Sequence, residues 1–142
     1  MTLIDANLLL YAYDPRAKEH EASRRWLEAA LSSPSLVRLA WVTVWAFLRI
    51  ATNPRVFERP LSIDEATGIV DAWLAQPNVG MLEPGDRHRE ILPRLLRDAQ
   101  ATGTLVMDAA LAAIAIEHGA TLYSTDQDFS RFPELAWVNP LV

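Results

Sequence analysis

The sequence contains no cysteine, and this absence removes several kinds of chemistry together. A chain without thiols forms no disulfide bond, offers no thiolate to zinc and has no cysteine nucleophile. Nothing ties the protein to an oxidising compartment, so we expect a cytoplasmic protein. No apolar run reaches the roughly 18 residues that a membrane span needs, and no basic segment precedes an apolar run at the N-terminus. We therefore expect neither export nor membrane insertion.

Positive charge is scarce. The 13 Lys and Arg residues face 18 Asp and Glu residues, which gives a net charge of -5. This balance argues against a protein that coats nucleic acid non-specifically, because such binding depends on neutralising phosphates. Lys18 is the only lysine. The remaining basic residues are arginines, which favour bidentate contacts to phosphate or carboxylate, although genomic base composition produces the same bias.

The short motifs of several common enzyme classes are also missing. The sequence contains no GxxxxGK[ST], GxGxxG or GxSxG segment, so P-loop chemistry, dinucleotide binding and acyl transfer by a nucleophile elbow lack support. The three histidines share no metal-ligand spacing. A length of 142 residues with 51% hydrophobic residues suits one core, so we expect a single domain over residues 1–142.

Short apolar segments alternate with helical patterns along the chain. The expected strands are residues 3–4, 36–40, 79–82, 120–124 and 135–138. The expected helices are residues 8–13, 16–31, 41–51, 62–76, 86–101 and 108–118. This alternation predicts an α/β fold with a short parallel sheet of four to five strands and helices on both faces. Pro93 should kink its helix or mark the true first turn.

Residues 41–51 are apolar almost all round, which predicts a core helix that also reaches an interface. Most of the five tryptophans should lie in the core. An exposed aromatic patch for a partner nevertheless remains plausible, and the sequence does not say which tryptophans would form it.

Aspartates stand at the ends of several expected elements. Asp5 ends the first strand, Asp126 ends the fourth, and Asp108 begins the alanine-rich helix that leads into the fourth. Ligands of parallel sheets bind beyond the carboxyl ends of the strands, so these acids should converge. Clustered carboxylates repel one another and call for a cation, and an all-oxygen ligand set favours Mg²⁺ or Mn²⁺.

Each acid also has a structural interpretation. Asp108 suits a helix N-cap, Asp5 could orient the turn that follows it, and Asp126 or Asp128 could cap a short terminal helix. Three separate caps at one face of the sheet are less probable than one cluster. The joint placement therefore favours a shared site.

The chain resembles the PIN-domain toxins of VapC type in segments that follow one another in order. These segments are Leu3–Tyr11, Phe47–Pro54, Val106–Ala113 and Gly119–Phe129. The resemblance continues to Trp137–Pro140 and covers essentially the whole chain. It implies a PIN-like fold and the toxin half of a bacterial toxin–antitoxin pair. Such toxins are endoribonucleases that depend on Mg²⁺ or Mn²⁺.

The resemblance also implies partners. Proteins of this type form homodimers and are neutralised by a VapB-type antitoxin, whose C-terminal segment blocks the acidic pocket. The expected substrate is RNA, with tRNA and rRNA both open. Recognition of single-stranded bases in an RNA loop fits an acidic protein with a small basic rim.

Site residues carry over from the family by position. Asp5, Asp108 and Asp126 match metal-binding acids, Asp128 matches an accessory acid, and Asn7 and Thr125 match polar groups that brace them. Arg49, Arg55 and Arg131 are the candidates to contact RNA phosphates. The competing interpretation makes Arg49 a buried structural pairing and the other two arginines solvated surface.

One position departs from the family pattern. A Glu is common in the helix after the second strand, and Ala46 stands at the corresponding place. No acid lies between Glu28 and Glu58 to replace it. A site with fewer carboxylates should bind a second metal more weakly.

Two other functional classes remain open from the sequence. The first is a catalytically weakened PIN-like dimeric module that engages an antitoxin or RNA without turnover. The second is a receiver-like domain with an Asp nucleophile beside Mg²⁺. The second usually requires a lysine near the phosphate, and Lys18 lies in the charged helix after Pro15.

Overall fold

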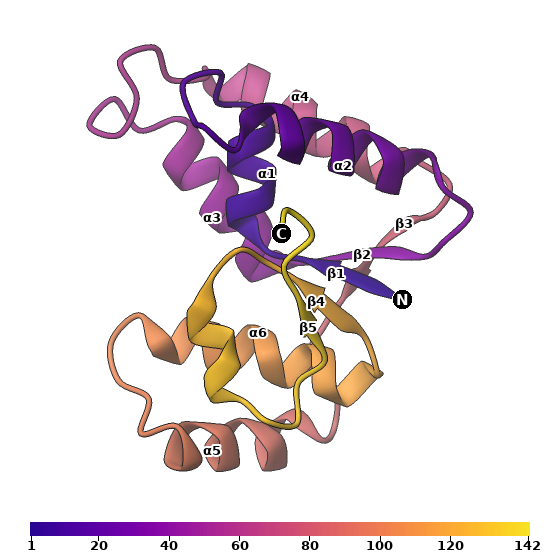
Figure 1. Ribbon diagram of the computed structural model, residues 1–142, viewed down its shortest axis with the longest axis vertical. Coiled ribbons are helices and arrows are strands. Elements are labelled where there is room, and N and C mark those ends of the chain that lie inside the picture. The colour runs from indigo at the N-terminus through magenta and orange to yellow at the C-terminus, as the bar shows by residue number, and fades with distance from the viewer.

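A parallel sheet of five short strands forms the centre of the protein in the computed structural model, which describes residues 1–142 (Figure 1). The strands are β1 (Thr2–Ile4), β2 (Val37–Ala40), β3 (Val79–Leu82), β4 (Thr121–Tyr123) and β5 (Trp137–Val138). Their order across the sheet is β3-β2-β1-β4-β5, and every neighbouring pair is parallel. The expected α/β class and parallel sheet are confirmed.

Six α-helices and one 3₁₀ helix connect the strands. They are α1 (Ala6–Ala12), α2 (His20–Ser32), α3 (Trp41–Ala51), α4 (Ile63–Leu74), α5 (His88–Asp98), α6 (Leu105–His118) and η1 (Gln127–Arg131). None of the helices is both long enough and apolar enough to cross a membrane.

Helices cover both faces of the sheet. Neighbouring residues of a strand point to opposite faces, so each strand contributes apolar side chains to a core on either side. Leu3 belongs to a core with α5, α6 and η1, whereas Ile4 belongs to a second core with α1 to α4. Figure 1 shows α1 to α4 on one side of the sheet and α5 and α6 on the other. Both side chains are fully buried, so the first strand is enclosed on both faces.

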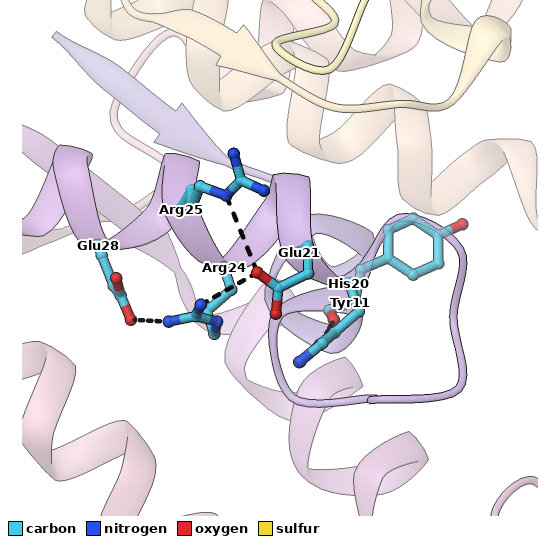
Figure 2. A network of polar contacts seen from close by, with 6 residues as sticks. All are labelled: Tyr11, His20, Glu21, Arg24, Arg25 and Glu28. Atoms are coloured by element: carbon cyan, nitrogen blue, oxygen red, sulfur yellow. Dashed lines mark hydrogen bonds and ion pairs between the residues drawn. The ribbon is translucent and has the colours of Figure 1, made fainter.

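Helix α2 carries its charged side chains on the surface. Arg24 forms ion pairs with Glu21 and Glu28 on neighbouring turns (Figure 2). Nδ1 of His20 lies 2.8 Å from the carbonyl oxygen of Tyr11, which can only accept, so Nδ1 carries the proton. This hydrogen bond fastens the start of α2 to α1.

Helix α4 begins with the capping box expected from its sequence. The Ser62 hydroxyl accepts from the amide of Glu65 at 3.0 Å, and the Glu65 carboxylate accepts from the amide of Ser62 at 3.0 Å.

Several helix starts differ from expectation by one to four residues, and the largest difference is that α2 begins at His20 and not at residue 16. Two of the differences decide predictions about single residues. Helix α6 begins at Leu105, so Asp108 lies inside its first turn and Thr104 takes the N-cap position. The prediction that Asp108 caps this helix is therefore wrong, because the helix extends three residues further toward the N-terminus. Helix α5 begins at His88, so Pro93 lies beyond its first turn and does not mark the start.

Candidate active site

Asp5 follows β1 directly, at the edge of the sheet where the carboxyl ends of the strands meet. It is the N-cap of α1, and its Oδ1 accepts a hydrogen bond from the amide of Ala6 at 2.8 Å. Its Oδ2 accepts from the hydroxyl of Ser124 at 2.7 Å. Ser124 follows β4, the strand that pairs with β1, so the sheet register brings the two residues together.

Ser124 is the centre of the hydrogen bonds beneath the acids. Its hydroxyl donates to Asp5 and accepts from Nδ2 of Asn7 at 3.2 Å and from the amide of Asp126 at 3.0 Å. A hydroxyl has one donor and two acceptor positions, so this oxygen is fully engaged. Ser124 is completely buried. Its three hydrogen bonds hold the end of β1, the start of α1 and the segment after β4 in fixed relative positions.

Three further carboxylates gather beside Asp5. One oxygen from each of Asp108, Asp126 and Asp128 lies within 4.8 Å of the other two. Asp126 also caps η1, because its Oδ1 accepts from the amide of Asp128 at 2.9 Å. Asp126 therefore combines the helix-cap role with a place in the cluster, and the two interpretations of this residue are compatible.

Electrostatics tie all four acids into one group. Partial burial and the negative charges of Asp126, Asp5 and Asp128 raise the pKa of Asp108 to about 6. Burial also raises the pKa of Asp5, and the charge of Asp126 adds to this, while hydrogen bonds from Ser124 and Ala6 oppose it. Arg131 lies near Asp128, but Asp5, Asp108 and Asp126 form no ion pair with a basic side chain. Clustered carboxylates without such a partner favour the binding of a cation.

A small cavity of about 110 Å³ opens between α3, α6 and the start of α1. Its lining includes Asp5 and Asp108 together with Thr43 and Ala46 of α3. Larger hollows exist elsewhere, including one of about 430 Å³ beside residues 13–16 and 56–59 that contains none of the clustered acids. The carboxylates, and not the size of the hollow, identify the small cavity as the candidate site.

The two residues predicted to brace the acids, Asn7 and Thr125, differ in the contacts that they make. Asn7 reaches the cluster through Ser124, not through Asp5 itself. Thr125 takes part in none of these hydrogen bonds, and its neighbour Ser124 holds Asp5 instead. The sequence contained a signal for Ser124, since a Ser at the end of a buried strand and two residues before an Asp suits a side-chain bond to the following backbone.

The three arginines proposed to contact RNA are all exposed. Nε of Arg131 lies 3.7 Å from Oδ1 of Asp128 and is therefore close to the cluster. Arg49 and Arg55 form no ion pair. Arg49 is thus not a buried structural pairing, and it lies one helical turn beyond Ala46 on α3.

The donor set fits a hard divalent cation. Only carboxylate oxygens converge, which suits Mg²⁺ or Mn²⁺ and not a metal that prefers sulfur or imidazole. Burial, and to a smaller extent the neighbouring negative charges, raise the pKa of Asp5 and of Asp108, so a bound positive ion would stabilise both carboxylates in their charged form.

Comparison with known proteins agrees with this fold. The PIN domain family model matches residues 2–135. Ribonuclease VapC37 of Mycobacterium tuberculosis is 44% identical over 140 residues, which are 99% of this chain and 97% of the relative. Ribonuclease VapC33 of the same organism is 38% identical over 141 residues, 99% of each chain.

Solved structures share the fold at low sequence identity. The crystal structure of VapBC2 from Rickettsia felis, bound to a DNA fragment from its promoter, covers 97% of both chains with a TM-score of 0.70 and 15% identity. The structure of VapC20 from Mycobacterium tuberculosis, described as a Sarcin-Ricin loop cleaving toxin, covers 92% of this chain and 93% of its own with a TM-score of 0.64 and 17% identity. The chain therefore belongs to the PIN domain family and, within it, to the VapC ribonucleases.

Proposed function

We propose that this protein is the toxin of a toxin–antitoxin pair and hydrolyses RNA phosphodiester bonds with the help of Mg²⁺ or Mn²⁺. The observation that carries the proposal is the convergence of four aspartates beside a cavity. Partial burial, and then the negative charges of the other three, raise the pKa of Asp108 to about 6. The ribonuclease names of relatives that match nearly the full chain support the same reaction.

Asp5 and Asp108 are the residues proposed to hold the principal ion, because both line the cavity. Asp126 completes the ligand set directly or through water. Asp128 is the accessory acid, since it is about half exposed and also lies near Arg131. A bound divalent ion supplies an activated water and neutralises charge on the scissile phosphate.

The remaining residues hold these carboxylates in place. The hydroxyl of Ser124 donates to one oxygen of Asp5 and so orients the Asp5 carboxylate before substrate binds. Asn7 fixes the Ser124 hydroxyl in turn, through Nδ2. Hydrogen-bonded partners of this kind orient metal ligands and raise metal affinity.

The substrate strand would enter from the exposed side of the cluster. Arg131 lies beside Asp128, and Arg49 follows the cavity-lining residue Ala46 on α3, so both are proposed to contact RNA phosphates. Arg55, on the exposed loop after α3, is the third candidate. RNA presented as an unpaired loop suits this small basic rim.

Ala46 affects the metal content of the site. It lines the cavity beside Asp5 and Asp108, at the place where the family resemblance predicts a Glu. Without a carboxylate on α3, the residues present provide for one firmly held ion and a weaker second one.

The same family membership supports a proposal for the partners. Relatives of this fold have been crystallised as VapBC complexes, including VapBC-1 from nontypeable Haemophilus influenzae. We therefore propose a VapB-type antitoxin, a homodimer and a cytoplasmic location for this chain. Trp41 and Trp45 are 42% and 62% exposed on α3 and stack against each other, which suits an interface between subunits.

Cleavage of RNA by purified protein tests the proposal. The protein, freed of antitoxin, is incubated with structured RNA in Mg²⁺, in Mn²⁺ or in EDTA, beside the variants Asp5→Asn and Asp108→Asn. Asp86→Asn is the matched control, because Asp86 is an exposed acid remote in sequence from the cluster. We expect cleavage only with metal, with 5′-phosphate and 3′-hydroxyl ends, and only in the wild type and the control.

Cleavage that persists in EDTA, or that survives both Asn substitutions, would show that the acids do not carry the reaction. Folded wild type that binds an antitoxin but cuts no RNA in Mn²⁺ would instead favour the weakened binding module.

A further inference from the structure

We propose that the Thr43 hydroxyl hydrogen-bonds to the hydration shell of the cation held by Asp5 and Asp108, and so positions that ion from the side of α3. This inference rests on the proposed metal site. It assigns a positioning role to a residue outside the aspartate cluster, on the helix where the family's acid is replaced by Ala46.

Thr43 has a buried hydroxyl without a partner. The residue is 2% exposed, and its Oγ1 makes no hydrogen bond within the protein. Buried polar groups in proteins are nearly always hydrogen-bonded, so an unpaired hydroxyl on a residue that lines a cavity is a candidate to bind a group held in that cavity.

The position of Thr43 in α3 explains why the helix cannot satisfy this hydroxyl. Threonines in helices usually donate to the carbonyl four residues earlier, as Thr52 does to Leu48 at 2.6 Å and Thr67 does to Ile63 at 2.8 Å. Helix α3 begins at Trp41, directly after β2, so the residue four positions before Thr43 is Leu39 of that strand. Its carbonyl belongs to a strand and not to a preceding helical turn.

The cavity provides the missing partner. Thr43 lines the same cavity as Asp5 and Asp108, and Ala46 lines it one helical turn further along α3. The sheet order places β2 next to β1, so the helix that starts from β2 begins beside the carboxylate that ends β1. Thr43 therefore lies beside the site that the two acids are proposed to provide for a cation.

The chemistry of the hydroxyl matches a hydrated ion. Mg²⁺ usually keeps several of its waters, and each of those waters needs a hydrogen-bond acceptor from its surroundings. A threonine oxygen accepts such a bond and can donate its own proton to a carboxylate. The side chain of Ala46 offers neither group, which leaves Thr43 as the polar side chain that α3 contributes to the cavity.

Binding of Mn²⁺ to the purified, antitoxin-free protein tests this role without relying on RNA cleavage. Free Mn²⁺ is measured by electron paramagnetic resonance during a titration of wild type, Thr43→Val and Thr43→Ser. Valine keeps the shape of threonine and removes the hydroxyl, whereas serine keeps the hydroxyl. We expect the valine variant to bind Mn²⁺ about tenfold more weakly and the serine variant to stay within about twofold of wild type.

Ser23→Ala is the matched control. Ser23 also has a fully buried hydroxyl without a hydrogen-bond partner, but it lies on α2 and does not line the cavity. Its removal should leave Mn²⁺ affinity unchanged. The melting temperature of Thr43→Val in EDTA should not fall below that of wild type, because the hydroxyl has no protein partner to lose.

The outcomes separate the two proposals. If wild type binds Mn²⁺ and Thr43→Val binds it equally well, Thr43 has no positioning role, although the metal site stands. The role is also overturned if serine weakens binding as much as valine. If wild type binds no Mn²⁺, both the metal site and the role of Thr43 fail. Should the valine variant not fold, Thr43→Ala replaces it, with the same tenfold expectation.

Discussion

Neutralising Asp108 should stabilise the metal-free protein while it abolishes the proposed reaction. In the folded chain the pKa of this carboxyl is raised from its ordinary value of 3.8 to about 6, first by partial burial and then by the charges of Asp126, Asp5 and Asp128. The substitution Asp108→Asn keeps the shape of the side chain and removes the charge that the fold disfavours.

The size of the effect follows from the pKa shift. A rise of about 2 units corresponds to about 3 kcal/mol if it is fully expressed. Asp108 is only partly buried, so solvent screening reduces this to about 1 kcal/mol. For a chain of this size that free energy raises the melting temperature by about 3 °C.

The sign depends on pH. Because the folded pKa lies above the unfolded one, the folded state binds more protons between pH 4 and pH 6, and the stability of the wild type falls as pH rises through this window. Asparagine has no such dependence. The gain in melting temperature should therefore be complete above pH 6 and absent near pH 4.

Thermal unfolding in EDTA at pH 7.5 and at pH 4 measures this gain, with Asp86→Asn as the control for loss of one exposed negative charge. A melting temperature of Asp108→Asn equal to or lower than that of wild type at pH 7.5 would refute the reasoning. An equal gain at both pH values would show that charge is not its cause.

Other substitutions probe the surroundings of the cluster. Ser124→Ala breaks three hydrogen bonds at a buried position, so the free energy of unfolding measured with urea should fall by about 2–3 kcal/mol, and a loss below about 0.5 kcal/mol would contradict this account. Ala46→Glu adds a carboxylate to the cavity and should lower the melting temperature in EDTA while tightening the binding of a second Mn²⁺ in calorimetry; unchanged stoichiometry and affinity would count against it. Trp45→Ser removes an exposed aromatic ring, so light scattering should show a monomer with little change in stability; a dimer of unchanged mass would exclude Trp45 from the interface.

The sequence predicted the sheet because its strands are short and enclosed on both faces. Leu3 and Ile4 form such a strand with only two core residues, and their opposite directions place one in each core. The capping box at Ser62 was equally local, since both partners lie within four residues. The capping box depends on neighbouring residues alone, and the strand is marked by its short apolar run.

The errors arose where tertiary contacts decide the outcome. Helix α6 starts before Asp108, with Thr104 at the N-cap position; Thr is a favoured N-cap residue type, but the Thr104 side chain makes no capping hydrogen bond. Ser124 was overlooked because its importance depends on Asp5, which is 119 residues away in the chain. The exposure of Trp41 and Trp45, beside the burial of Trp73, likewise follows only from the placement of α3 and α4.

The sequence identified the four candidate acids, but it did not show which of them lie close enough together to bind one metal ion. The three oxygens that lie within 4.8 Å of one another come from Asp108, Asp126 and Asp128, whereas Asp5 shares the cavity with Asp108 and has both oxygens engaged in hydrogen bonds. Distances between side chains on separate elements cannot be obtained from spacing in the sequence. The proposed ranking puts Asp5 among the ligands and Asp128 outside them.

The most direct test of this account is a crystal structure of the antitoxin-free protein soaked with Mn²⁺, with the ion located by its anomalous scattering. We predict a peak in the cavity within ligand distance of Asp5 and Asp108, with Asp126 bound directly or through water. A structure with Mn²⁺ held by Asp126 and Asp128 without Asp5, or with no ion at the aspartates at all, would contradict the proposed site.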